Sequence, residues 1–246
     1  MKTVWTQIYI QLRMDARDKG TILVFYLVPL GFYAVMGAVF SSVNPEIKPV
    51  LSATMAIFSI TMGAVIGLPP ALVKLREAGV LRAYQVSGIP GRSTLAGMGI
   101  SAFLHLALVA VIISVSAPLL FGAQMPQHMG GYLLTLLALL VCSVALGLLI
   151  GVVASTQAAA MMISQAVFMP SLMLSGIMFP ANLLPAPLEY LGNVFPATHA
   201  MRAFHALAYG AHTDFQGSLA LGIVFGMAFL AVIASVWKFE LTTRVA

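Results

Sequence analysis

The chain has 246 residues, of which 61% are hydrophobic and only 8% are charged, and its formal net charge is +5. Soluble domains carry about 25% charged residues, so this composition excludes a soluble fold and predicts a helical bundle surrounded by lipid. In a membrane protein an excess of lysine and arginine indicates which loops are cytoplasmic. It therefore gives no reason to expect a nucleic-acid partner.

Residues 1–19 predict an amphipathic helix. Val4, Ile8 and Leu12 recur at helical spacing, with Trp5 beside them, whereas amide and acidic side chains fall on another face. Charged residues interrupt the stretch, so it lacks the apolar region of a cleaved signal peptide. We expect this helix to lie flat in the membrane interface, with Trp5 at headgroup depth; a frayed polar terminus is the alternative.

Uncharged apolar runs follow in chain order, each long enough to cross a hydrocarbon core of about 30 Å. We therefore expect an all-α integral membrane protein with a single domain, residues 1–246. Its six predicted spans are residues 21–41, 50–73, 93–121, 131–154, 158–178 and 215–237.

The lysines and arginines fix the orientation. With the N-terminus inside, the outer segments hold only Lys48 and Arg202. The inner segments hold the other ten basic residues: Lys2, Arg13, Arg17, Lys19, Lys74, Arg76, Arg82, Arg92, Lys238 and Arg244. This bias predicts cytoplasmic N- and C-termini in a plasma membrane, and we expect a prokaryotic inner membrane.

The segment before the last span is broken by prolines. Phe179, Pro180, Pro185 and Pro196 lie in it, and the pieces between them are too short to cross the membrane. A seventh span here would also move the basic C-terminus outside. We expect short re-entrant helices on the outer side, shielded by protein. They would act as an extracellular gate, or alternatively as a passive cap.

Signatures of enzymatic chemistry are missing from the sequence. It contains neither the GxxxxGK[ST] pattern of a P-loop nor an HExxH zinc motif, and the single cysteine, Cys142, excludes an internal disulfide or a CxxC site. All acidic residues are expected in loops or at span ends, whereas a proton- or sodium-coupled carrier usually places a carboxylate at mid-membrane. We therefore expect no enzymatic activity, metal site or cofactor in this chain.

Polar side chains inside the spans are few. His105 is the only ionisable residue expected well inside a span. We expect it to belong to the substrate pathway, where it would act as a relay, or else to be a hydrogen-bonded packing residue. Gln157, Ser164, Ser171 and Ser175 are separated by seven, seven and four residues, so they share one stripe of the fifth predicted span. The stripe has two interpretations: it lines a substrate pathway, or it joins helices by hydrogen bonds.

The inner loop between the second and third predicted spans, the Lys74–Pro90 loop, is rich in charge. Lys74, Arg76, Glu77 and Arg82 lie in a short helical pattern whose apolar stripe includes Gly79, and Gly88 and Pro90 end it. A charged helix on the inner membrane face suits a cytoplasmic partner, with Glu77 binding that partner or a neighbouring arginine. The alternative is a basic loop that only anchors topology.

The Lys74–Pro90 loop resembles the cytoplasmic loop of the ABC-2 type permease family. It reads REAGVLR from Arg76 to Arg82 and then SGIP from Ser87 to Pro90, whereas the family typically reads R-E-x-G-T-L-x-x-L before a small residue and a proline. Val80 and Tyr84 depart from that pattern without altering its amphipathic spacing. A second match, LSGIMFP at Leu174–Pro180, is similar to the extracellular segment before the family's last span.

The resemblance implies a permease subunit of an ATP-binding cassette exporter. ATP and Mg²⁺ would bind a separate cytoplasmic ATPase, and a second permease copy, identical or related, would complete the pathway. The Lys74–Pro90 loop and the N-terminal helix would transmit the motion, and the substrate would be a drug, an antibiotic or a lipid-like molecule. The alternatives are a self-sufficient carrier or channel, and an intramembrane enzyme.

Overall fold

The computed structural model describes residues 2–43, 45–178, 184–210 and 216–244, and every regular element in this part of the chain is helical. Six helical segments are long and apolar enough to cross a membrane. They are Lys19–Ser42, Lys48–Glu77, Gly91–Phe121, Met129–Val153, Gln157–Leu174 and Gly217–Leu241. These bounds lie within a few residues of the predicted ones, so the all-α fold with six spans is confirmed.

The first two spans are helices interrupted by π-helical turns, and prolines explain both. Proline lacks an N–H and crowds the carbonyl four residues before it, which disturbs an α-helix. Pro29 follows one such turn, and Pro69 and Pro70 follow the other. In the first span the segments are α2 (Lys19–Ile22), η1 (Leu23–Leu27) and α3 (Val28–Val43). In the second they are η2 (Pro45–Val50), α4 (Leu51–Met62), η3 (Gly63–Gly67) and α5 (Leu68–Glu77).

The remaining spans are single helices. They are α7 (Gly91–Phe121), α8 (Met129–Val153), α9 (Gln157–Leu174) and α12 (Gly217–Arg244). Shorter elements are α1 (Lys2–Asp15), α6 (Val80–Val86), α10 (Ala186–Gly192), α11 (Pro196–Ala203) and η5 (Phe204–Ala208). The α4–α5 segment and α8 form the centre of the bundle, and most of their residues are buried.

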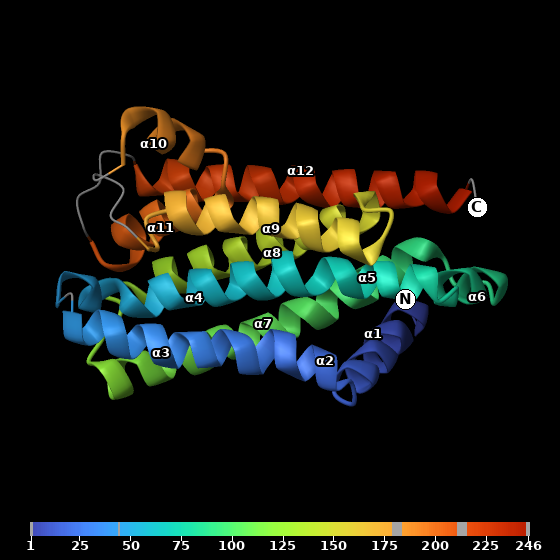
Figure 1. Cartoon of the computed structure of the whole chain (residues 1–246), viewed down its shortest axis with the longest axis horizontal. Helices are drawn as coiled ribbons and strands as arrows, with labels where there is room; N and C mark the ends of the chain where they lie inside the picture. Colours follow the sequence, from blue (N-terminus) through green and yellow to red (C-terminus); the bar gives the residue numbers. More distant parts are fainter. Residues whose placement is uncertain (1, 44, 179–183, 211–215, 245–246) are drawn as a thin grey trace.

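The two ends of the bundle differ (Figure 1). Both termini, α1, α6 and the turn between α8 and α9 lie at one end, whereas α10 and α11 lie at the other. An even number of spans requires the termini to share an end, as Figure 1 shows. The Lys74–Pro90 loop and the segment before the last span are therefore at opposite ends, as the sequence predicts.

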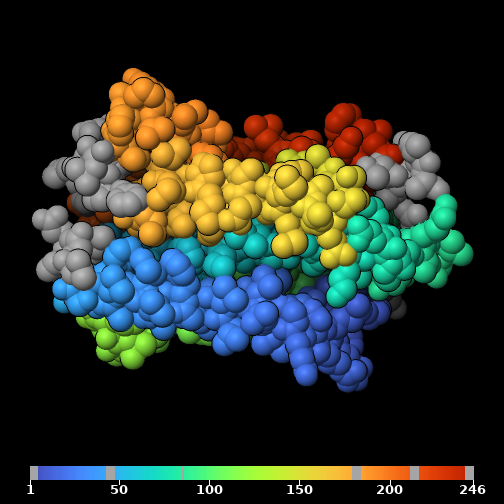
Figure 2. Space-filling view, viewed as in Figure 1, coloured from blue at the N-terminus to red at the C-terminus, as the bar shows by residue number. Residues whose placement is uncertain are grey.

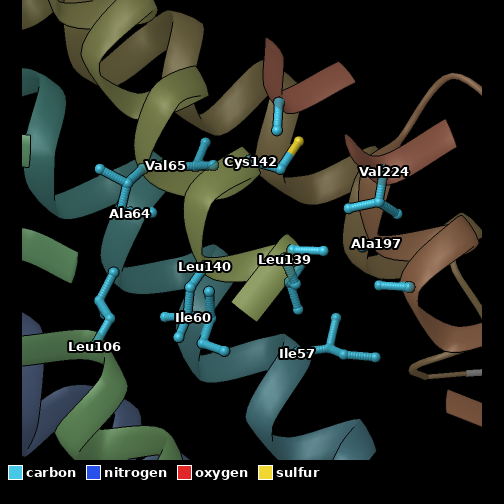
Figure 3. Close-up of a cluster of buried hydrophobic side chains, with 14 of the residues drawn as sticks. Ile57, Ile60, Ala64, Val65, Leu106, Leu139, Leu140, Cys142, Ala197 and Val224 are labelled. Carbon is cyan, nitrogen blue, oxygen red and sulfur yellow. The ribbon is translucent and has the colours of Figure 1, made fainter. Parts of the chain in front are cut away.

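The interior is filled by closely packed apolar side chains from several helices (Figure 3). Ile57 and Ile60 of α4, Leu139 of α8 and Val224 of α12 are all fully or almost fully buried. Cys142 lies in the same cluster, as a small buried side chain. Because lipid is as apolar as these side chains, van der Waals contact at close range is what stabilises the bundle.

Two glycines of α8 allow the closest of these contacts. A Cβ atom on Gly147 would lie 2.2 Å from the carbonyl oxygen of Ala64, and one on Gly151 would lie 3.1 Å from the Cα atom of Pro69. The backbones of α8 and the η3–α5 segment therefore touch where Gly147 and Gly151 stand. The spacing of Gly147 and Gly151, GxxxG, recurs at Gly222 and Gly226 of α12, yet nothing in the described chain lies within 4 Å of either Cβ position there.

We predict that Gly147→Ala destabilises the folded bundle by about 1–3 kcal/mol, the usual range for overpacking, because a methyl group cannot fit against the Ala64 carbonyl. Gly222→Ala is the matched control, and it should be neutral because its Cβ meets open space. The measurement is the unfolding midpoint of both variants in detergent. Equal midpoints for Gly147→Ala and the parent chain would contradict the packing described here.

Candidate functional site

The residues expected to couple the chain to an ATPase lie at one helix-to-helix junction. Lys74, Arg76 and Glu77 are in the last turn of α5, and Arg82 is in α6. Gly79 joins the two helices with a φ of 71°, a left-handed conformation that other residues rarely adopt. Lys74, Glu77 and Arg82 are exposed at this end of the bundle.

Arg76 binds the carboxyl end of α8. Its guanidinium donates to the carbonyl oxygens of Val152 at 3.4 Å and Ser155 at 3.2 Å, and it also donates to the carbonyl oxygen of Ala154. The last carbonyls of a helix have no partner within the helix and carry partial negative charge. A cation at this position therefore stabilises the end of α8.

Glu77 binds the amino end of α9. One carboxylate oxygen accepts a hydrogen bond from the Gln157 side-chain amide at 2.7 Å, and the other accepts from the Gln157 backbone N–H at 3.3 Å. An anion there complements the partial positive charge of a helix N-terminus. Adjacent residues of α5 thus hold both helix ends that meet at the turn between α8 and α9. The sequence did not indicate this contact; it placed Gln157 on a stripe that either lines a pathway or joins helices.

The same end of the bundle holds Asp18, the N-terminal cap of α2. Its carboxylate accepts from the backbone N–H and the hydroxyl of Thr21, each at 2.9 Å. These hydrogen bonds lower the pKa of Asp18, and Lys74 lowers it further through its charge.

The predicted polar stripe of α9 faces the interior of its own chain. Ser164, Ser171 and Ser175 are each at most 2% exposed, whereas Gln157 is exposed at the start of the helix. The opposite face of α9 lies on the molecular surface (yellow in Figure 2). Exposed side chains of α9 on the surface include Met161, Met162, Gln165, Met169 and Met173.

His105 does not stand alone in the third span. The Asp15 carboxylate lies 3.7 Å from His105 Nε2 and accepts hydrogen bonds from Ser101 at 2.6 Å and Gln11 at 2.9 Å. Tyr26 contributes its hydroxyl, 2.6 Å from His105 Nδ1. When Tyr26 donates to Nδ1, the proton of the neutral ring is on Nε2 and faces Asp15. We call these five residues the Asp15 cluster.

The sequence placed Asp15 on the polar face of the N-terminal helix and did not identify the Asp15 cluster. Asp15 ends α1 and reaches side chains about 15–20 Å along α7 at 1.5 Å per residue. Gln7 of the same face is buried, and Trp5 is 69% exposed. Gln7, Gln11 and Asp15 recur every four residues, as do Gly97, Ser101 and His105, and this matching spacing was the available signal.

The segment between α9 and α12 is held by its own hydrogen bonds. Thr198 donates to the carbonyl oxygen of Gly192 at 2.6 Å, and His199 Nε2 donates to that of Asn193 at 2.8 Å. Arg202 donates to the Asn193 side chain at 2.7 Å and lies 3.7 Å from Glu189. Burial lowers the pKa of His199, which keeps its ring neutral at pH 7. The α10–α11 corner is therefore a preformed unit.

Two of the four predicted gate residues, Pro185 and Pro196, belong to this corner. Pro185 is the N-terminal cap of α10 and is exposed, whereas Pro196 opens α11 and is buried. Phe179 and Pro180 lie outside the residues that the structure describes.

Six apolar spans around a packed interior define a polytopic helical membrane protein. Residues 3–209 match the ABC-2 type transporter family, and the match covers most of the chain up to the end of η5. The chain therefore belongs to the ABC-2 type transporter family and is a permease subunit of an ABC transporter. A search of curated proteins found no significant match. Family membership favours the permease over the carrier and the intramembrane enzyme.

We predict that Asp15→Ala lowers the free energy of unfolding by about 1–3 kcal/mol, because Ser101 and Gln11 lose a charged acceptor in a partly buried site. Asp15→Asn should cost less, since an amide oxygen still accepts a hydrogen bond. Arg17→Ala, an exposed neighbour, is the control. Unfolding midpoints in detergent measure all three. A midpoint for Asp15→Ala equal to that of Arg17→Ala would show that the cluster does not hold α1.

Proposed function

We propose that this permease exports its substrate, and that a separate cytoplasmic ATPase, with ATP and Mg²⁺, supplies the energy. A second permease copy completes the pathway, either as a homodimer or as a related heterodimer. The substrate class that we favour is a small amphipathic molecule such as a drug, an antibiotic or a lipid-like compound. The observation that carries the proposal is the contact of Arg76 and Glu77 with the two helix ends at the turn between α8 and α9.

Through this contact, a movement of the ATPase can be transmitted to the membrane-spanning helices. A partner that pushes on α6 displaces α5, because only Ala78 and Gly79 separate the two helices. Arg76 and Glu77 then carry the displacement to the ends of α8 and α9, since charge-assisted hydrogen bonds are short and strong. Lys74 and Arg82 are exposed on the same junction and are the groups that we assign to the partner.

The orientation follows from charge. Ten of the twelve lysines and arginines belong to segments at the end of the bundle that carries both termini, and we assign this end to the cytoplasm of a plasma membrane. Trp5 and Tyr9 are exposed on α1 at that end, where amphipathic aromatic rings suit the headgroup region.

The exposed face of α9 is our assignment for the pathway. Gln165 and four methionines occupy it, and unbranched thioethers adapt to apolar ligands of varied shape. A second copy facing this surface would enclose it. The buried serines Ser164, Ser171 and Ser175 then lie outside the pathway, and the hydroxyls of Ser164 and Ser175 have no hydrogen-bond partner among the described residues.

The α10–α11 corner is our assignment for the outer gate. Its hydrogen bonds make it a rigid piece, and α11 packs against α8 and α12, so movement of those helices would move the corner. Cross-links that join α10 of one copy to α10 of the second should stop export. Export that continues in the cross-linked protein would identify the corner as a passive cap.

We predict that Glu77→Ala leaves membrane insertion intact and lowers transport per ATP hydrolysed, within the 5- to 150-fold range of typical coupling free energies. Gln157→Ala removes the shorter of the two hydrogen bonds to Glu77, while the backbone N–H at position 157 stays, so it should reproduce part of the loss. Glu77→Gln should keep part of the coupling. The measurement is transport and ATPase activity of the reconstituted complex.

The Gln157 variant separates two roles of Glu77. If Glu77 acts only on the ATPase, then Gln157→Ala is without effect and the intramolecular connection is not the coupling route. Normal transport by both alanine variants would remove the assignment altogether.

We also predict how single cysteines in α9 react with a small water-soluble thiol reagent. Gln165→Cys and Met169→Cys should react and be protected by substrate, whereas Ser164→Cys and Ser171→Cys should be inert because those positions are buried. Native Cys142 is buried and contributes little background. The opposite pattern would return the pathway to the serine stripe, and inertness at every position would exclude α9 from the pathway.

A further inference from the structure

A groove runs along α7, α8 and α12 and has a volume of about 310 Å³. Its walls are formed mainly by apolar side chains such as Ile100, Val141 and Val232. Among the described residues, Arg92 is the only charged one in the lining, and it stands in the first turn of α7. The one other polar side chain, Ser235, donates its hydroxyl to the carbonyl oxygen of Val232 in its own helix at 2.9 Å. We call this surface the Arg92 groove.

The Arg92 groove opens towards lipid. Its three helices are all candidate spans, and Ile100, Val141 and Val232 on its walls are 36–41% exposed. An apolar lining offers water no hydrogen bonds, and an unfilled groove forfeits van der Waals contacts along its length. The groove volume is about ten times the ~30 Å³ share of one liquid water, which a methylene group resembles in size. A hydrocarbon chain is the ligand whose size and apolar surface suit this groove.

The length of the groove matches one leaflet. On α7 its lining runs from Arg92 to Phe103, which is about 16 Å at 1.5 Å per residue. Half of a hydrocarbon core of about 30 Å has nearly the same thickness. Arg92 therefore stands at headgroup depth, and Phe103 stands near mid-membrane. The leaflet is the cytoplasmic one under the orientation proposed above.

The charge of Arg92, at one end of the groove, determines which kind of lipid headgroup can bind there. Arg92 is exposed and makes no hydrogen bond or ion pair with any residue that the structure describes. A guanidinium forms paired hydrogen bonds with phosphate oxygens, and a basic residue at a membrane surface attracts anionic lipid. We propose that the Arg92 groove is a binding site for an anionic phospholipid, with one acyl chain along α7 and the headgroup on Arg92.

Trp237 gives a readout beside the groove, because it neighbours the lining residue Val236 on α12 and is 65% exposed. Trp5→Phe leaves Trp237 as the single tryptophan of the chain. This variant is reconstituted in phosphatidylcholine vesicles that contain a small fraction of brominated lipid, which quenches tryptophan fluorescence on contact. Brominated phosphatidylglycerol should quench about fivefold more effectively than brominated phosphatidylcholine, the factor that corresponds to about 1 kcal/mol for one basic residue.

Variants in the same background locate the site. Arg92→Ala should abolish the preference, and Ala96→Phe should abolish it while keeping the charge, because the ring fills the groove. Arg92→Lys should retain a preference, and Arg17→Ala, which removes a charge at the same end of the bundle, should leave it unchanged. Size-exclusion profiles of the variants show that each is folded.

A preference that survives Arg92→Ala overturns the proposal, and so does equal quenching by both lipids in the parent protein. Equal quenching is the result expected if a second copy of the chain or a zwitterionic lipid occupies the groove. The assay contains no ATPase and no transported substrate, so its failure leaves the permease assignment untouched. Failure of the coupling test would in turn leave the lipid site in place.

Discussion

The contact between α8 and the η3–α5 segment is the constraint on which the rest of the bundle depends. Gly147 and Gly151 bring the two backbones together, with the Ala64 carbonyl where a side chain would otherwise stand. In lipid no hydrophobic effect drives helices together, so close van der Waals contact decides which surfaces pair. These two segments are the most buried of the spans, and α7, α9 and α12 pack around them.

That contact also places the coupling residues. Pro69 and Pro70 start α5 after a π-helical turn, and α5 then runs along α8 to the end of the bundle. Arg76 and Glu77 arrive beside the turn between α8 and α9 with opposite charges. Each charge meets the helix end of complementary polarity, so two neighbouring side chains hold two helices. A displacement of α5 cannot leave α8 and α9 unmoved without breaking these bonds.

Two charged side chains, Asp15 and Arg92, are placed in opposite ways, because lipid offers a charge no partner. The Asp15 carboxylate is satisfied by Ser101 and Gln11 and faces His105, so α1 is fixed to α7 by hydrogen bonds. Arg92 contrasts with it, since its charge faces outwards at one end of an apolar groove. The first arrangement joins elements of the chain, whereas the second is open to a ligand from the membrane.

The sequence by itself determined the class of fold, the number of spans and the end at which each loop lies. These features depend on the length of apolar runs and on the placement of charge, and both are local properties of the chain. Only the tertiary structure decided which surfaces meet. Gly147–Gly151 and Gly222–Gly226 carry the same pattern, but only the first pair lies against another backbone within the described chain. Likewise Gln157 shares a sequence stripe with Ser164, yet it binds Glu77 at the end of the bundle while Ser164 is buried. The rotation of each helix, which sets these partners, results from the fit of many side chains at once, and no local pattern contains it.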